Sequence, residues 1–197
     1  MVEWLVVGLG NPGKEYAHSP HNIGFMVIDR LAEGCGGSVQ RKLARALTGE
    51  VSIGDRPVLL AKPQTYMNLS GESVASLLEK KTIGPRGLVV VYDDHDLPWL
   101  ALRIRPLGSA GGHHGMESII GSIGTNEFTR VRLGIDFGHG RAEPEYLLKP
   151  LGREQRKQLD SFLDYAAQAV VSIISEGVEM AMTRFNRRAQ GENIEEE

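Results

Sequence analysis

The sequence has almost no cysteine and no long apolar run, and each absence excludes a class of protein. A single cysteine, Cys35, among 197 residues excludes an internal disulfide and any zinc site built from several cysteines. No stretch approaches the roughly 20 apolar residues of a membrane-spanning helix. The first residues also lack the pattern of a secretory signal. We therefore expect a cytoplasmic protein with no membrane segment.

A strong excess of basic residues is missing as well, since the formal net charge is -3. The last seven residues, GENIEEE, hold four of the 25 acidic residues, so the rest of the chain carries 22 basic and 21 acidic residues. We expect residues 191–197 to be a disordered acidic tail and residues 1–190 to form one domain. The net charge does not exclude a polyanionic ligand, because the positions of Lys and Arg decide that question.

Short apolar runs alternate with amphipathic segments along the whole chain. Residues 3–9 and 87–94 are typical of buried strands, residues 47–63 of a hairpin, and residues 100–106 and 129–136 of half-buried strands. Helical periodicity covers residues 22–37, 68–81 and 153–188, with Gly177 dividing the last segment. This pattern predicts a single-domain α/β fold with a mixed twisted sheet flanked by helices, including C-terminal helices.

Residues 8–13, GLGNPG, match the G-x-G-x-x-G pattern of a dinucleotide-binding loop. In such a loop the third glycine opens a helix whose N-terminus faces the pyrophosphate. Here Pro12 and Pro20 prevent a helix from beginning before about Asn22, so a long loop follows the glycines. Asp29 lies inside the following helix instead of at a strand end. The pattern therefore disfavours a nicotinamide or flavin cofactor.

Polar residues fill the loop after the first strand: Asn11, Tyr16, His18 and His21. Loops at the carboxyl ends of parallel strands are where α/β folds place their chemistry. His21 precedes the helix that begins near Asn22, where the helix dipole disfavours an imidazolium. A neutral imidazole can accept a proton, so His21 is a candidate general base, although a histidine at a helix start is also commonly a capping or packing residue.

Two further segments place polar side chains at the ends of predicted elements. YDDHDLP closes the most apolar strand with Asp93, Asp94 and Asp96, and PQTYMNLSG brings Tyr66 and Asn68 ahead of a helix. Each of these residues is also a common turn or capping residue. We expect the carboxylates to face a cleft, because an apolar strand of this kind is central in the sheet.

Residues 106–115 form a glycine-rich loop that carries His113 and His114. Adjacent side chains diverge, so this pair is a poor metal chelate, and no H-x-x-x-H or H-x-x-E-H spacing occurs in the chain. We therefore expect no metal site. The glycines predict a mobile loop.

Arginines alternate with apolar residues in two predicted strands. Arg103 and Arg105 share one face of LALRIRP, and Arg130 and Arg132 share one face of TRVRLGID. A guanidinium group binds phosphate through two parallel hydrogen bonds, so paired arginines near a glycine loop suit a phosphate clamp. The alternative is that they are solvated charges on the outside of the sheet.

Together these clusters resemble the bacterial-type peptidyl-tRNA hydrolase family. The matching segments are VVGLGNPGKEY, HNIGF, KPQTYMNLSG, YDDHDLP, GGHHG and FTRVRLGI, which cover nearly the whole chain up to the C-terminal helices. The resemblance implies an α/β enzyme that cleaves the ester between a peptide and the 3′-terminal adenosine of tRNA. It implies no metal and no cofactor, and peptidyl-tRNA is the expected partner of a monomer.

The resemblance also assigns roles to catalytic residues. His21 matches the family's general base, and Asp93 matches the carboxylate that orients it. Asn11 and Asn68 match asparagines that position the substrate and distinguish peptidyl-tRNA from aminoacyl-tRNA. A neutral His21 would take a proton from the attacking water while amide groups donate to the developing oxyanion.

Outside the catalytic group, Tyr16 and Tyr66 match residues that line the site, and Arg105 and Arg132 match a pair that clamps the tRNA 5′-phosphate. One position departs from the family pattern. The family usually has GGHNG where this chain has GGHHG, so His114 replaces an asparagine. A neutral imidazole cannot offer the donor and acceptor geometry of an amide, so we expect substrate handling by this loop to differ from the family's.

Two other functions remain open at this point. A non-catalytic RNA-binding member of the same fold, similar to organellar group II intron splicing factors, is favoured by His114 and disfavoured by the retained His21, Asp93, Asn11 and Asn68. A nicotinamide-dependent oxidoreductase rests on the glycine pattern alone, and titration with the cofactor would test it.

Overall fold

The computed structural model describes residues 1–138 and 144–186, and it contains one seven-stranded sheet. The strands are β1 (Trp4–Gly8), β2 (Arg41–Leu43), β3 (Ala46–Ile53), β4 (Arg56–Pro63), β5 (Leu88–Pro98), β6 (Leu102–Arg105) and β7 (Thr129–Asp136). Their order across the sheet is β2-β3-β4-β1-β5-β7-β6. Strands β4, β1, β5 and β7 run parallel, whereas β2, β3 and β6 pair antiparallel with their neighbours. The predicted hairpin is formed by β3 and β4.

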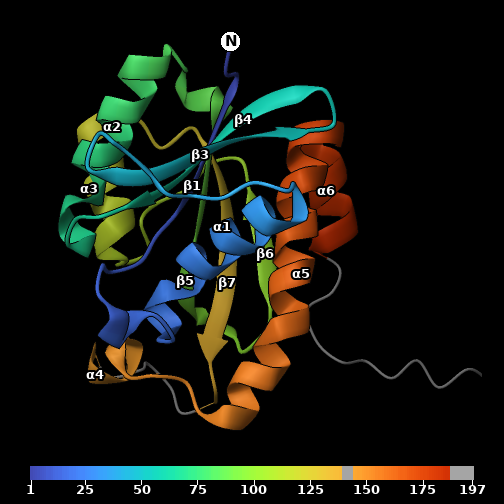
Figure 1. The fold of residues 1–197 in the computed structure, drawn as a ribbon. Helices are drawn as coiled ribbons and strands as arrows, with labels where there is room; N and C mark the ends of the chain where they lie inside the picture. Colours follow the sequence, from blue (N-terminus) through green and yellow to red (C-terminus); the bar gives the residue numbers. More distant parts are fainter. Residues whose placement is uncertain (139–143, 187–197) are drawn as a thin grey trace, which may run out of the picture.

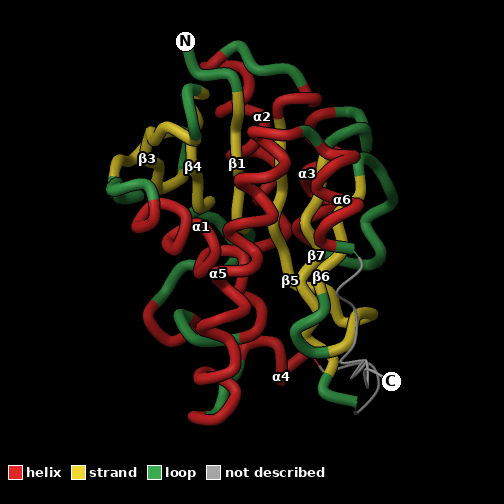
Figure 2. Tube along the Cα trace, turned by 90° about the vertical axis from the view of Figure 1, so that its right-hand side faces the viewer, coloured by secondary structure: helices red, strands yellow, loops and turns green. Residues whose placement is uncertain are grey.

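Helices cover both faces of this sheet (Figures 1 and 2). They are α1 (Ile23–Gly34), α2 (Ser70–Lys81), α3 (His114–Ile123), α4 (Pro144–Leu148), α5 (Arg153–Glu176) and α6 (Val178–Phe185). One apolar core joins α1, α5 and α6 to the sheet, and a second core joins α2 and α3 to its other face. Successive residues of β1 and β5 point into different cores, as the alternation of side chains along a strand requires. The expected α/β class, mixed sheet and C-terminal helices are confirmed.

Four short 3-10 turns complete the fold: η1 (Lys14–Tyr16), η2 (Pro20–Asn22), η3 (Met67–Leu69) and η4 (Pro85–Gly87). The first two lie in the long loop between β1 and α1, and α1 begins at Ile23, so the prediction that the α-helix begins near Asn22 is confirmed. Gly177 separates α5 from α6 with a φ of 94°, as expected. The predicted tail at 191–197, and the last residues of the helical region predicted at 153–188, lie outside the described residues.

The glycines of GLGNPG bring α1 close to the end of β1. A Cβ atom on Gly8 would lie 2.2 Å from the carbonyl oxygen of Gly24, and one on Gly24 would lie 2.5 Å from the carbonyl oxygen of Val91. Side chains at either position would push the helix away from the sheet. These glycines therefore allow backbone contact between α1, β1 and β5, and this contact places the loop before α1 beside the end of β5.

The prediction that residues 129–136 form a half-buried strand is wrong. β7 lies between β5 and β6, and only Arg132 and Asp136 escape full burial. Arg130 is 1% exposed, with its guanidinium 4.6 Å from the centre of the Phe128 ring. Its Nη atoms donate to the carbonyl groups of Ser109 and Asn126, which come from the loops around α3. These loops therefore shield the Arg130 guanidinium from water, whereas the Arg132 side chain is 27% exposed.

Candidate active site

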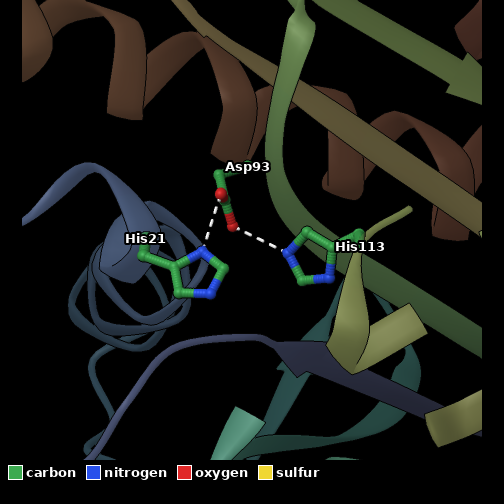
Figure 3. A group of neighbouring side chains, drawn as sticks. All are labelled: His21, Asp93 and His113. Carbon is green, nitrogen blue, oxygen red and sulfur yellow. Dashed lines mark hydrogen bonds and ion pairs between the residues drawn. The ribbon is translucent and has the colours of Figure 1, made fainter. Parts of the chain in front are cut away.

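Asp93 holds two histidines, one on each carboxylate oxygen (Figure 3). The Oδ2 atom lies 2.7 Å from Nδ1 of His21, and the Oδ1 atom lies 2.9 Å from Nε2 of His113. The Asp93 and His113 side chains are 3% and 7% exposed, and the His21 side chain is 13% exposed. We call His21, Asp93 and His113 the His-Asp-His cluster. Its members come from three segments that are far apart in the sequence.

The strand pattern explains how Asp93 reaches this position. Along β5, Val89 and Val91 point into the core under α1 and α5, and Asp93, two residues further on, points to the same face of the sheet. Asp94 points to the opposite face. Asp93 lies where the strand leaves the apolar core. Its carboxylate can be buried there because two histidines donate hydrogen bonds to it.

Backbone contacts fix the tautomer of His113. Its Nδ1 atom accepts hydrogen bonds from the backbone N–H groups of Gly115 (3.1 Å) and Met116 (3.3 Å) at the start of α3. Nδ1 is therefore unprotonated, and the ring proton is on Nε2, which donates to Asp93. His113 is a neutral donor that caps α3 and orients Asp93 at the same time.

His21 has the complementary arrangement. Its Nδ1–H donates to Asp93, and its Nε2 lies on the side of the ring away from the carboxylate, where it makes no hydrogen bond with the described residues. A neutral ring held in this way presents an unshared electron pair on Nε2. This is the form that a general base requires.

The charges in the cluster shift two pKa values in opposite directions. Burial disfavours the charged form of His21, but the charge and hydrogen bond of Asp93 outweigh it and raise the pKa of His21. Burial also disfavours the ionised form of Asp93, yet His21 and His113 outweigh it and hold the pKa of Asp93 well below its usual range. The prediction that the helix start disfavours the imidazolium gives the opposite direction for this pKa, because it did not include the neighbouring carboxylate.

The same three side chains could also hold a metal ion, since one ligand atom from each lies within 4.8 Å of the others. Sequence spacing did not reveal this group, because its members are distant in the chain. The observed hydrogen bonds favour proton transfer, since both oxygens of Asp93 accept from histidine N–H groups and the Nδ1 atom of His113 accepts from backbone.

The two predicted asparagines lie in different settings. The backbone N–H and C=O groups of Asn11 pair with the side chain of buried Asn22 at 2.8 and 2.9 Å, so Asn22, next to His21, fixes the loop. Asn68 lies in η3 with an exposed side chain. Neither asparagine side chain makes a hydrogen bond within the described part of the chain, which leaves both amides available to a ligand.

The remaining predicted lining residues lie outside the cluster. Tyr66 is exposed, and Tyr16 is partly buried at the end of η1. The His114 side chain is 77% exposed and lies 3.2 Å from Glu117, so the structure does not bring it to Asp93. Sequence reasoning selected His114 from the histidine pair and missed His113. The only local signal for His113 is the helix start that follows it.

The structure brings the predicted phosphate-binding arginines to one cavity. Arg105 and Arg132 both line a cavity of about 210 Å³ between β5, β6, β7 and the glycine-rich loop. The partners differ, because Arg132 Nε lies 2.6 Å from the carboxylate of Asp94, whereas Arg105 makes no ion pair with the described residues. Arg130, which was not selected as a site residue, lines the same cavity.

The fold and the cluster define a class: an α/β protein that holds a histidine base on a buried carboxylate at the ends of its central parallel strands. Comparison with known proteins narrows this class. The peptidyl-tRNA hydrolase family model matches residues 5–193. A peptidyl-tRNA hydrolase from Solibacter usitatus is 57% identical over 194 residues, covering 98% of this chain and 99% of its own length. A second, from Koribacter versatilis, is 47% identical over 188 residues, 94% of each chain.

A solved structure agrees with these sequence matches. The crystal structure of peptidyl-tRNA hydrolase from Acinetobacter baumannii has a TM-score of 0.85 and 32% sequence identity, covering 93% of this chain and 94% of that chain. The chain belongs to the peptidyl-tRNA hydrolase family. Among the residues that the structure describes, no helix has both the length and the apolar character needed to cross a lipid bilayer.

Proposed function

We propose that the chain hydrolyses the ester between a peptide, or an N-blocked aminoacyl group, and the 3′-terminal adenosine of tRNA. The observation that carries this proposal is the 2.7 Å contact between His21 Nδ1 and Asp93, which leaves Nε2 of His21 free to accept a proton. Family membership supports the substrate. The reaction releases free tRNA and a peptide, and the proposed site of action is the cytoplasm.

The chemistry needs one base and a set of hydrogen-bond donors. Nε2 of His21 takes a proton from water as the water oxygen attacks the ester carbonyl, and Asp93 stabilises the resulting imidazolium. The amides of Asn11 and Asn68 donate to the carbonyl oxygen as it becomes negative. When the tetrahedral intermediate collapses, His21 returns the proton to the departing 3′-oxygen of the adenosine.

His113 acts as a positioning residue in this scheme. It donates to Oδ1 of Asp93 while backbone N–H groups hold its other ring nitrogen, so it keeps Oδ2 directed at His21. Tyr16, Tyr66 and His114 would line the path of the substrate. No metal or cofactor takes part in the proposed steps, and the protein acts as a monomer.

The alternative, a non-catalytic RNA-binding protein of the same fold, does not need a histidine with a free ring nitrogen on a buried carboxylate. The two functions differ in one assay. The hydrolase cleaves N-acetyl-aminoacyl-tRNA and releases the N-acetyl-amino acid, but it does not cleave an aminoacyl-tRNA whose amino group is free. A protein that only binds RNA cleaves neither of these two substrates, and that result would refute the proposed function.

Asn68→Ala is expected to lower kcat about 10²- to 10³-fold, the usual effect of removing one oxyanion donor. The exposed Asn68 side chain supports no described contact, so stability should not change. Steady-state hydrolysis of N-acetyl-aminoacyl-tRNA measures this effect. The matched control is Gln64→Ala, which removes another exposed amide from the same segment and should retain activity. Equal activity of the two variants would remove Asn68 from the site.

Arg105→Ala is expected to weaken tRNA binding and to reduce the salt dependence of binding, because each phosphate contact contributes a slope of about -0.7 to -0.9 in log K against log salt. Binding titrations between low and moderate salt measure the slope. Arg56→Ala is the control, since Arg56 is also exposed but lies at the turn between β3 and β4, where β4 begins. An unchanged slope for Arg105→Ala would exclude Arg105 from the clamp.

A further inference from the structure

A cavity of about 200 Å³ lies between the start of α1 and the β3–β4 hairpin. We call it the α1 cavity. One wall is a stripe of residues at the helical spacing i, i+3, i+4 and i+7, formed by Asn22, Phe25, Met26 and Asp29. The hairpin and the segment after it contribute Leu47, Lys62 and Gln64. The loop between β1 and α1 closes one end of the cavity with Asn11, Pro12 and Ala17.

Asn11 joins the α1 cavity to the His-Asp-His cluster. It lines the cavity, and its backbone pairs with the side chain of Asn22, the residue next to His21. The proposed reaction uses the amide of Asn11 as a donor to the ester carbonyl. The α1 cavity is therefore continuous with the place where the ester is proposed to lie.

The strand order puts the α1 cavity and the predicted RNA contacts on opposite sides of the cluster. Across the sheet, β3, β4 and β1 are followed by β5, β7 and β6. The α1 cavity lies at β3, β4 and the loop after β1, whereas Asp93 is on β5. Arg132 and Arg105 are on β7 and β6. RNA that reaches the cluster from the side of these arginines leaves the side of the α1 cavity to the peptide.

The length of the α1 cavity matches a short piece of extended peptide. Its wall runs along the helix from Asn22 to Asp29, and these seven residues span about 10 Å. An extended chain advances about 3.3 to 3.6 Å per residue. With the ester-bearing residue at Asn11, the residue that precedes it in the peptide falls inside the cavity.

The α1 cavity combines apolar surface with one closed ion pair. Phe25 is buried, and Met26 and Leu47 are partly buried. Nζ of Lys62 lies 2.5 Å from Oδ1 of Asp29 and 5.9 Å from the centre of the Phe25 ring. The Lys62 side chain is 13% exposed, so its ammonium group is largely shielded from water. The two charges cancel, so a charged ligand group would lose hydration here without gaining a counter-ion.

From this arrangement we propose that the α1 cavity is a peptide subsite, which accepts an uncharged side chain from the residue that precedes the ester-bearing residue. The ion pair of Lys62 and Asp29 sets the preference for an uncharged side chain, because removing one of its charges leaves the other without a partner. This inference rests on the proposed function, and it deepens it by naming which part of the peptide the site distinguishes.

The test measures kcat/KM of the full chain on four substrates of the form N-acetyl-X-Ala-tRNA, where X is leucine, glycine, glutamine or glutamate. All four share the same tRNA and the same ester. The native protein should prefer leucine to glycine about tenfold, because the leucine side chain leaves water. It should prefer glutamine to glutamate about tenfold, because the two side chains have the same shape and only glutamate brings a charge. Equal kcat/KM for all four substrates would overturn the subsite.

Asp29→Asn tests the ion pair. It leaves Lys62 without its counter-ion, so the ratio of the glutamine to the glutamate substrate should fall about tenfold or more, as the glutamate side chain gains a charged partner. The matched control is Asp55→Asn, which removes the same charge from an exposed turn residue outside the cavity and should keep the native ratio. If Asp29→Asn keeps the native ratio, or if Asp55→Asn lowers it equally, the ion pair does not set the preference.

Ala17→Phe tests the space in the cavity. Ala17 is exposed, lines the cavity and has an ordinary helical backbone conformation, so a phenylalanine there should occupy the cavity without strain. The ratio of the leucine to the glycine substrate should fall toward one. His18→Phe is the control, because it adds the same ring at the next exposed residue, which does not line the cavity. A native ratio in Ala17→Phe would contradict the subsite.

A fifth substrate, N-acetyl-Ala-tRNA, separates this proposal from the proposed function, because it has no residue before the ester-bearing one. A native protein that cleaves it, but cleaves the four longer substrates equally, keeps the hydrolase function and loses the subsite. A native protein that cleaves none of the five loses the hydrolase function and the subsite with it. Each comparison is a ratio of two substrates on one variant, so a partial loss of folded protein cancels.

Discussion

His21→Ala should lower kcat for N-acetyl-aminoacyl-tRNA about 10²- to 10⁴-fold, which is the usual contribution of a general base. KM should change much less, because His21 acts on water and not on the bound RNA. The cluster geometry is the reason for this expectation, since only Nε2 of His21 is free of hydrogen bonds to the described residues while Asp93 fixes its Nδ1. Single-turnover hydrolysis measures the effect without interference from product release.

The control for this variant is His18→Ala. His18 is an exposed histidine of the same loop, three residues earlier, and its described contact uses only its backbone carbonyl group, which accepts from Leu151. Its replacement should retain the native rate. If His21→Ala keeps more than about a tenth of the native kcat, His21 is not the general base.

Asp93→Asn should lower kcat by as much as about 10⁴-fold, because it changes which ring nitrogen of His21 carries the proton. Asp93 accepts one hydrogen bond from each histidine, whereas an asparagine offers one acceptor and one donor. His113 must donate, because backbone N–H groups occupy its Nδ1 atom. The asparagine oxygen therefore faces His113, its amide group faces His21, and the proton of His21 moves to Nε2, where it blocks acceptance from water.

The acid limb of the pH profile of this variant should shift in a defined direction. Asp93 raises the pKa of His21, so in the native protein the acid limb of kcat/KM should lie above pH 6.5, and activity should fall as pH drops through it. Removing the carboxylate removes the cause of that increase, so the residual activity of Asp93→Asn should have its acid limb at lower pH. Asp96→Asn, on the same strand, should leave the limb in place. An acid limb that moves to higher pH in Asp93→Asn would contradict the electrostatic effect of Asp93 on His21.

Much of the fold could be predicted from local patterns, because each central element carries its own signal. The apolar run at 87–94 gave the buried strand β5, the alternation around Gly54 gave the β3–β4 hairpin, and Gly177 marked the boundary between α5 and α6. The prolines at 12 and 20 correctly predicted a long loop after β1 instead of a dinucleotide site. Residues at strand ends then pointed to His21 and Asp93, which the structure places in contact.

The residues that were missed depend on contacts between distant segments. His113 looked like half of a poor chelating pair, and only the packing of α3 against the sheet brings its ring to Asp93. Arg130 looked like a solvated charge, because its alternation with Val131 is the same in an exposed strand and in one covered by loops. The direction of the His21 pKa shift could not be predicted from the sequence, because a helix dipole lowers this pKa and a carboxylate raises it. The 2.7 Å contact between His21 and Asp93 decides between them.

The most direct test of the account is hydrolysis of N-acetyl-aminoacyl-tRNA by the native chain in the presence of excess chelator. Because the proposed steps use only His21, Asp93 and the two amides, the protein should release the N-acetyl-amino acid and intact tRNA at the same rate with and without chelator. Absence of release would contradict the hydrolase function. Loss of activity with chelator, restored by added metal, would instead show that the reaction needs a metal ion, for which the His-Asp-His cluster is the candidate site.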